Sequence, residues 1–317
     1  MSAAEDVSLA PALGGRGRSA LARVERRDGY LFILPWAIGF VVFFMGPMLA
    51  SLVLSFTEWQ ILLAPKWVWL RNYQVMFAGT DTLIRDRLIT IALLNTATYA
   101  FFSVILYTIL ALFLSLALNP DIRGMRIYRT MYFVPSVTPI VAATLMWIIL
   151  FHPSLGAINY VLSVFGIPKQ GFFTDVTQSK PTLILMHLWS IGGALPIYLA
   201  GLKGIPEELY EAARIDGAGL MKMFRYVTVP LLSPTIFFVV ITGFIGGFQV
   251  FTQAYIATGG GPQNSTLFYV LYLYNNAFLF FKMGYASAMA WILFIIILAF
   301  TVIQFWVAQR WVYYERT

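Results

Sequence analysis

Long stretches without a charged residue constrain this sequence more than any other feature. The first runs from Leu31 to Phe56 and contains no Lys, Arg, Asp or Glu. A helix needs about 20 apolar residues to cross the hydrocarbon core of a bilayer, so this stretch can span it with some tilt. Stretches of this kind predict six spans, near residues 31–56, 88–118, 131–151, 181–202, 232–257 and 285–308.

The composition requires the same environment. Hydrophobic residues make up 60% of the chain and charged residues 11%, against about 25% charged in a soluble domain. A chain this apolar cannot cover its surface in water, so we expect an all-α integral membrane protein surrounded by lipid. One transmembrane domain, residues 29–317, is expected to follow a disordered basic tail at residues 1–28. The sequence has no cysteine, and no metal site is predicted.

The uncharged stretch between Arg225 and Lys282 is too long for one span. Three glycines and a proline at residues 259–262 interrupt it, because such a run cannot continue a stable helix. The remainder, residues 265–281, is just long enough to span but leaves too few residues for a reversal before the last span. We therefore expect residues 265–281 to form an interfacial or re-entrant helix on the outer side.

Basic residues predict the orientation. With six spans and an inner N-terminus, 14 Lys and Arg residues fall in inner segments and seven in outer ones. Basic residues are enriched in cytoplasmic loops, so both termini are predicted to be cytoplasmic. These residues are spread over short loops and form no basic face, so the net charge of +7 does not indicate a nucleic-acid partner.

The inner loop at residues 204–230 predicts two short helices. Pro206 suits the first position of a helix, and Glu207 and Glu208 favour the positive end of its dipole. Gly217 can adopt the left-handed conformation that ends this helix.

A second short helix follows, and Pro230 is expected to close it before the next span. Its predicted apolar face consists of Leu220, Met223, Phe224 and Val227. Two rigid helices with an apolar stripe offer a surface that another protein can push. The alternative is a solvated amphipathic loop.

The order of residues in this loop resembles the EAA loop of binding-protein-dependent ABC importers. It reads Glu211-Ala212-Ala213, then Gly217, and ends on Val227-Thr228-Val229-Pro230. The family pattern has Ile and Leu at the two valine positions, a mild departure. The fuller run, which includes Asp216, is similar to the carbohydrate branch, the maltose and glycerol-phosphate type permeases. Shorter similar blocks in the same order cover nearly all of the chain after about Tyr30.

This resemblance implies a type I ABC importer permease fold with cytoplasmic coupling helices, in the cytoplasmic (inner) membrane of a bacterium or archaeon. It also implies three kinds of partner: a second homologous permease subunit, two ATPase subunits and an extracytoplasmic solute-binding protein. The chain has no phosphate-binding loop ending in Lys-Ser/Thr. We therefore expect it to be no enzyme and to bind no cofactor, with ATP and magnesium held by the ATPase subunits.

In such importers the EAA loop docks into a groove of the ATPase. The residues expected to couple the two subunits are Glu211, Ala212, Ala213, Asp216, Gly217 and Pro230. Glu211 would make a charged contact there. The alternative is that its carboxylate lies solvated on the surface, where an ion pair contributes little.

Polar groups in the fourth and fifth predicted spans are candidates for a transport path, because a polar solute needs hydrogen-bonding groups near the midplane. The residue types themselves indicate Trp189, Gln249 and Gln253, since aromatic faces and amides suit a sugar ring. The resemblance adds the positions that build the substrate site in related permeases, namely His187, Ser190, Gly193, Gly243, Gly247 and Val250. The alternative is that the glycines allow close helix packing and that His187 bonds a neighbouring backbone.

The sequence also predicts a polar stripe along the second span. Asn95, Tyr99 and Ser103 are four residues apart and therefore share one face. These side chains either line the path or bond neighbouring helices.

The predicted function is an ATP-driven importer permease for a sugar or similar small polar organic solute, with glycerol phosphate or another non-sugar solute as the alternative. Three other functions remain. An ion-coupled transporter usually needs a carboxylate inside a span, and none is predicted. An intramembrane enzyme needs paired acids or a histidine cluster, and the chain has two histidines. Against a structural scaffold, the sequence offers the EAA loop.

Overall fold

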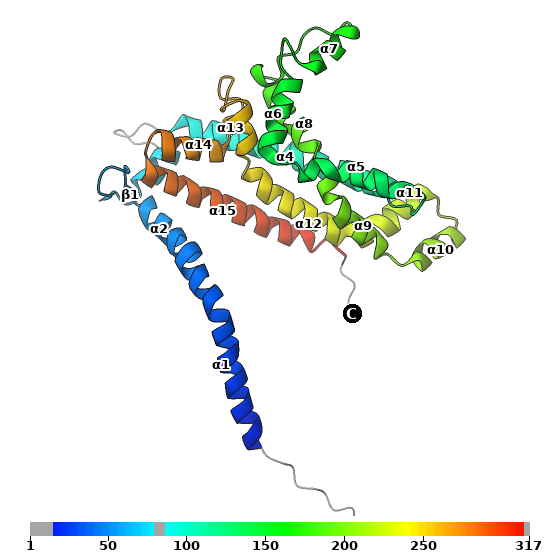
Figure 1. The fold of residues 1–317 in the computed structure, drawn as a ribbon, viewed down its shortest axis with the longest axis horizontal. Coiled ribbons are helices and arrows are strands. Elements are labelled where there is room, and N and C mark those ends of the chain that lie inside the picture. The colour runs from blue at the N-terminus through cyan, green and yellow to red at the C-terminus, as the bar shows by residue number, and fades with distance from the viewer. Residues whose placement is uncertain (1–14, 79–85, 314–317) are drawn as a thin grey trace, which may run out of the picture. The chain divides into compact units, whose positions relative to one another are not determined.

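The computed structural model describes residues 15–78 and 86–313, with only the backbone for residues 15–21. This part of the chain is helical apart from its loops and one small antiparallel sheet (Figure 1). The predicted all-α class is confirmed. The chain divides into two units, residues 1–53 and residues 54–317, and each is described by itself.

The first unit is one long helical segment. Helix α1 (Gly15–Phe40) continues through the π-helical turn η1 (Val41–Met45) into α2 (Gly46–Ser55). The basic tail that was expected to be disordered is therefore helical from Gly15 onward, and residues 1–14 lie outside the described part. Residues 20–25 read Ala-Leu-Ala-Arg-Val-Glu, which are mostly strong helix formers.

The second unit contains the sheet and the remaining helices. In chain order they are β1 (Thr57–Glu58), β2 (Lys66–Trp67), α3 (Arg71–Phe77), α4 (Arg87–Ala117), α5 (Met125–Val137), α6 (Ile140–Leu150), α7 (Ala157–Val164), η2 (Phe172–Thr174), α8 (Ser179–Leu188), η3 (Ile191–Ala194), α9 (Leu195–Lys203), α10 (Glu207–Ile215), α11 (Leu220–Met223), η4 (Phe224–Thr228), α12 (Val229–Phe248), α13 (Thr252–Ala257), α14 (Tyr269–Tyr274), η5 (Asn275–Leu279) and α15 (Met283–Ala308).

Helix α4 is the central element of this unit and packs against α8, α9, α12 and α14. It begins at an N-cap, where the Asp86 carboxylate accepts a hydrogen bond from the Leu88 amide at 3.0 Å. Ala92, Ala100 and Ala111 are buried along it, and such small residues let neighbouring helices approach closely. Its 31 residues extend about 46 Å at the rise of an α-helix.

Six segments of the described residues can cross a membrane by length and composition. Four are continuous: Ala22–Ser55, Arg87–Ala117, Leu220–Phe248 and Met283–Ala308. The other two are bent pairs, α5 with α6 and α8 with α9. The predicted number of spans agrees with this count.

Two predicted spans are not straight. In place of the span at 131–151, α5 and α6 meet at 96° and the pair begins at Met125. Pro139 explains the bend, because a residue before proline is driven out of the helical region and Thr138 is extended (ψ 128°). The predicted span at 181–202 is bent by 40° at the break between α8 and η3.

The predicted span at 232–257 begins and ends earlier than expected. One helix runs from Leu220 to Phe248 through η4, and α13 is separate. The second short helix predicted in the inner loop is therefore the start of this span, and Pro230 does not close it. The π-helical turn η4 comes directly before α12 and widens the helix, which accommodates a residue with no N–H to donate. Leu220, predicted on the apolar face, is 84% exposed.

Residues 265–281 do not form a span. The helix that α14 and η5 form together covers residues 269–279, well short of the about 20 residues that cross a bilayer. Its side chains are buried against the core, and the Tyr269 hydroxyl donates to the Met289 carbonyl of α15 at 3.0 Å.

The second unit has two distinct ends. Figure 1 shows α10 and α14 at opposite ends of it. We call the region of β1, β2, α3 and α14 the α14 end. Residues 118–124 and 203–219 form the α10 end.

Candidate transport cavity and its two ends

A cavity of about 430 Å³ lies beside the middle of α4, against the break between α8 and α9 and the end of α12. Its lining residues are Tyr99, Val104, Tyr107, His187, Ser190, Gly193, Ala194, Ile197, Val239, Thr242, Gly243, Gly246, Gly247, Gln249, Val250, Phe251, Thr252 and Gln253. Among the described residues, no charged side chain lines it. Its size and its mixture of aromatic and neutral polar groups suit a small polar ligand.

Eight of the nine residues predicted for the path line this cavity, and their contact with a solute stays a prediction. The exception is Trp189, which is absent from the lining. It follows the last residue of α8, and its ring lies edge-on to Trp147 with centroids 6.5 Å apart. The packing of Trp189 is therefore with α6.

His187 lies between two tyrosines of α4. Its ring centroid is 6.3 Å from that of Tyr99 and 5.2 Å from that of Tyr107. The Ser190 hydroxyl donates to the His187 carbonyl at 2.8 Å, which satisfies a carbonyl left free where α8 ends. Aromatic contacts thus position the imidazole at the cavity wall.

Gly243 and Gly247 have a packing role as well as a place in the lining. A Cβ on Gly243 would lie 2.9 Å from Val104 Cγ1, and a Cβ on Gly247 would lie 3.1 Å from Ala100 Cβ. These glycines therefore let α12 approach α4 closely, as the alternative interpretation had it. A Cβ on Gly246 meets nothing within 4 Å although this residue lines the cavity too. Sequence reasoning missed this difference because it depends on which face of α12 meets α4.

The polar stripe of α4 has two functions. The Asn95 amide nitrogen donates to the carbonyls of Asn264 (2.7 Å) and Leu267 (3.2 Å), and its oxygen accepts from Lys180 Nζ at 2.9 Å. Asn95 therefore joins α4 to α8 and to the loop before α14. Tyr99, one turn further along, lines the cavity.

At the α10 end, the chain forms a sharp, capped turn after α10. Gly217 has a φ of +73°, as its left-handed prediction requires. Its amide donates to the Arg214 carbonyl (3.0 Å) and the Ala218 amide donates to the Ala213 carbonyl (2.9 Å), the Schellman pattern. Pro206 is the N-cap of α10, one position before the predicted one. The Tyr210 hydroxyl lies 2.9 Å from the Thr228 hydroxyl and so connects α10 to η4.

The same end exposes apolar side chains next to acidic ones. Ile215, Leu220 and Met221 are each at least 75% exposed, and no residue of α10 is buried. Glu211 is exposed, and among the described residues no basic nitrogen lies within 4.0 Å of its carboxylate. An exposed apolar surface of this kind marks an interaction site.

At the α14 end, a second cavity of about 680 Å³ contains charged groups. Its lining residues are Glu58, Trp59, Gln60, Val68, Arg71, Asn72, Val75, Asp86, Arg87, Tyr272, Asn276, Lys282 and Tyr285. The Asp86 carboxylate accepts 2.7 Å hydrogen bonds from Tyr272 and Tyr285. Among the described residues, neither Arg87 nor Lys282 has a carboxylate oxygen within 4.0 Å. We call this the outer pocket; nothing in the sequence alone had assembled it.

Residues 108–313 match the model of a protein family described as the binding-protein-dependent transport system inner membrane component. This match covers α10, η4 and all of α12. The chain belongs to this family. It is a multi-pass permease of the inner membrane and a transport subunit rather than an enzyme.

Relatives of this permease match over nearly its whole length. The probable ABC transporter permease protein YesP of Bacillus subtilis (strain 168) is 41% identical, over 95% of this chain and 98% of that protein. The lactose transport system permease protein LacF of Rhizobium radiobacter is 34% identical, over 92% and 98%. A chain in the crystal structure of a bacterial ABC transporter involved in the import of the acidic polysaccharide alginate has the same fold, with a TM-score of 0.80 at 22% identity over 92% of this permease and 99% of that chain.

Proposed function

We propose that this permease passes a carbohydrate, or a similar small polar organic solute, through the central cavity. The cavity lining carries the proposal. Tyr99, Tyr107 and His187 present rings, while Gln249 and Gln253 offer amide groups. A sugar has an apolar ring face and a polar rim, so it needs both kinds of partner. The printed names of the lactose and alginate relatives support the same solute class.

The permease would work in an assembly with a second homologous permease, two ATPase subunits and an extracytoplasmic solute-binding protein. The family description supports the binding protein. ATP and magnesium would be held by the ATPase subunits, and this chain would bind no cofactor. The apolar side chains exposed on the first unit, such as Phe32, Phe43 and Phe44, would be covered by lipid or by the second permease.

The α10 end would dock on an ATPase subunit. Glu211 would make the charged contact, and Ala212 and Ala213 are small enough to let the two surfaces approach. Asp216 and Gly217 form the turn that sets the angle between α10 and η4. Pro230 would act within the continuous helix that carries movement from this end toward the cavity.

The orientation that fits this assembly places both termini and the α10 end in the cytoplasm. The excess of Lys and Arg in those segments supports it. The α14 end then faces outward, where a solute-binding protein approaches.

The outer pocket would receive the solute-binding protein. Arg87 and Lys282 line it without a carboxylate partner among the described residues. Trp59 and Tyr272 add aromatic surface next to them. The complementary partner is a protein surface bearing Asp or Glu side chains, because charge complementarity guides such encounters.

Co-purification from native membranes tests the assembly. The tagged permease is solubilised in detergent and recovered, and the accompanying proteins are identified by mass spectrometry. We expect a second permease and an ATPase, and a solute-binding protein when its ligand is present. Recovery of the chain alone, with uptake driven by an ion gradient instead of ATP, would contradict the proposal.

A further inference from the structure

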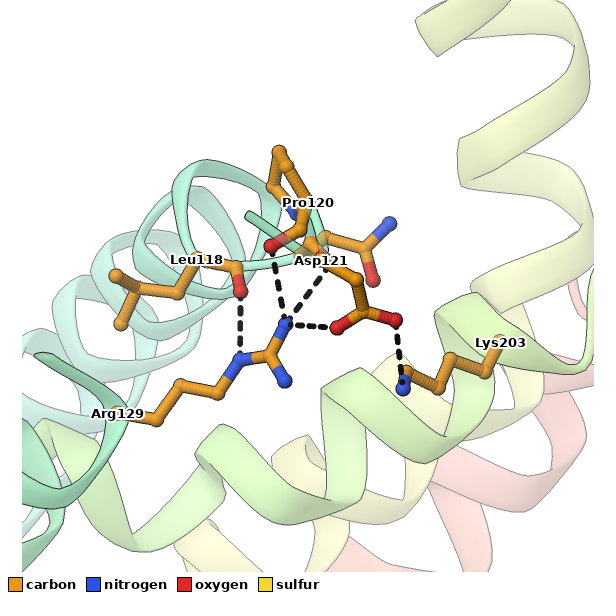
Figure 2. Close-up of polar contacts among 6 residues, drawn as sticks. Leu118, Pro120, Asp121, Arg129 and Lys203 are labelled. Carbon is orange, nitrogen blue, oxygen red and sulfur yellow. Dashed lines mark hydrogen bonds and ion pairs between the residues drawn. The ribbon is translucent and has the colours of Figure 1, made fainter. Parts of the chain in front are cut away.

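Arg129 of α5 holds the C-terminal end of α4 (Figure 2). Its Nε donates to the Leu118 carbonyl at 2.9 Å, and its Nη2 donates to the carbonyls of Asn119 (2.9 Å) and Pro120 (3.3 Å). The same Nη2 lies 3.0 Å from Asp121 Oδ1. Carbonyls at the end of a helix lack intrahelical partners, and the guanidinium fork satisfies several at once.

Asp121 extends this contact to α9. Its other oxygen, Oδ2, accepts from Lys203 Nζ at 3.4 Å, and Lys203 is the last residue of α9 (Figure 2). Hydrogen bonds from Arg129 and then from Lys203 hold the pKa of Asp121 below its usual value, so this carboxyl is ionised at neutral pH. Three residues, Gly204 to Pro206, separate Lys203 from α10.

The connection from Lys203 to α10 is itself anchored. Ile205 is 9% exposed and packs in a cluster with Leu202 and Leu232. Tyr210 of α10 packs against the same cluster. A displacement of α10 therefore acts on the end of α9.

The rest of α5 reaches the cavity wall. Tyr132 and Ser136 follow Arg129 by three and seven residues, which places all three on one face of α5. A Cβ on Gly192 would clash with the Tyr132 carbonyl oxygen, and a Cβ on Gly193 would lie 3.3 Å from Ser136 Cβ. Gly193 lines the cavity. One face of α5 thus contacts both the α4 end and the cavity wall.

We propose that Arg129, Asp121 and Lys203 form a clasp of positioning residues that transmits the displacement of α10, through α5, to the wall of the central cavity. The inference rests on the proposed function, in which ATPase subunits move α10. The clasp makes the ends of α4, α5 and α9 move as one body, and the backbone contact at Gly192 carries that movement to the α8–α9 break. Packed elements linked by ion pairs are a physical route for such coupling.

The test is the number of solute molecules imported per ATP hydrolysed, measured on the full complex in liposomes with the binding protein present. Arg129→Gln removes the charge and the fork, and we expect this ratio to fall about fivefold or more, while ATP hydrolysis continues. Arg126→Gln is the matched control, because this exposed arginine lies on the same helix outside the clasp. Its ratio should equal that of the wild type.

Lys203→Gln keeps the test valid if Arg129→Gln fails to assemble, since the Lys203 side chain is 55% exposed. We expect a lower ratio here too, and the double variant Asp121→Asn/Lys203→Gln should fall no further than Asp121→Asn alone. Unchanged ratios in Arg129→Gln and Lys203→Gln overturn the clasp. So does a loss of uptake explained entirely by less assembled complex. A wild-type complex that imports nothing overturns the proposed function itself, and the clasp with it.

Discussion

The central cavity is lined by neutral groups and glycine backbone, whereas the α10 end is organised by charged side chains and an exposed apolar surface. A cavity inside the membrane has to avoid buried charge, because an unpaired ion in a low-dielectric environment is costly. Charges at the α10 end lie outside the membrane-crossing segments, and they can serve recognition and the attachment of helix ends. The difference separates two tasks, accommodating a solute and receiving a mechanical displacement, and substitutions in each region should fail in different ways.

The largest expected effect comes from filling the cavity without touching its walls. Gly246→Leu places a side chain into open space, because a Cβ there meets nothing within 4 Å. We expect uptake to fall to background while the complex assembles normally, as measured with labelled solute in liposomes. The control is Val302→Leu on exposed α15 surface. Normal uptake in Gly246→Leu would remove this cavity from the path.

The next largest effect separates the α10 end from the cavity. Glu211→Ala should leave ATP hydrolysis in place but lower uptake about tenfold, because a charged contact across an interface would be lost. Glu208→Ala lies on the same helix, outside the set expected to couple the subunits, and serves as the control. Equal uptake by Glu211→Ala and the wild type would sink the coupling role of this carboxylate.

A smaller effect should come from the glycine that serves packing. In Gly247→Ala the new methyl group would lie 3.1 Å from Ala100 Cβ and 3.2 Å from its Cα. Overpacking of this kind costs about 1–3 kcal/mol, so we expect a lower unfolding temperature of the purified permease. Gly246→Ala, one residue away, should unfold at the wild-type temperature. Identical temperatures for both variants would contradict the close approach of α4 and α12.

The smallest effect should come from the turn after α10. Gly217→Ala adds strain of about 1–2 kcal/mol, since the left-handed conformation disfavours a Cβ, although no atom lies within 4 Å of it. We expect a modest fall in the initial uptake rate, less than that of Glu211→Ala. Gly219→Ala is the control because Gly219 has a φ of −73° and the same open surroundings. A similar fall in both variants would show that the loss is not due to backbone strain.

The sequence predicted the membrane class and the long helices well. Runs without charge located α4 and α15 to within two residues, because a lipid-exposed helix must be apolar along its whole length. It also indicated Gly217 as a left-handed cap, since glycine is the residue that adopts this conformation without strain.

Features that depend on tertiary packing were not predictable in the same way. The 96° bend before α6 and the continuous helix through Pro230 depend on how neighbouring helices and a π-helical turn accommodate proline. The different surroundings of Gly246 and Gly247 depend on the rotation of α12 about its axis. The clasp joins Asp121 to Lys203, which are 82 residues apart, so no local pattern announces it.

The most direct test of the central claim is ATP-driven uptake of labelled sugars by the reconstituted complex, comparing the wild type with Gly246→Leu. The panel should include a neutral disaccharide, an acidic oligosaccharide and glycerol phosphate. We predict that ATP enclosed with the ATPase subunits drives uptake of a sugar by the wild type and that Gly246→Leu abolishes it. Uptake without ATP, or equal uptake by the variant, would contradict a solute path through this cavity.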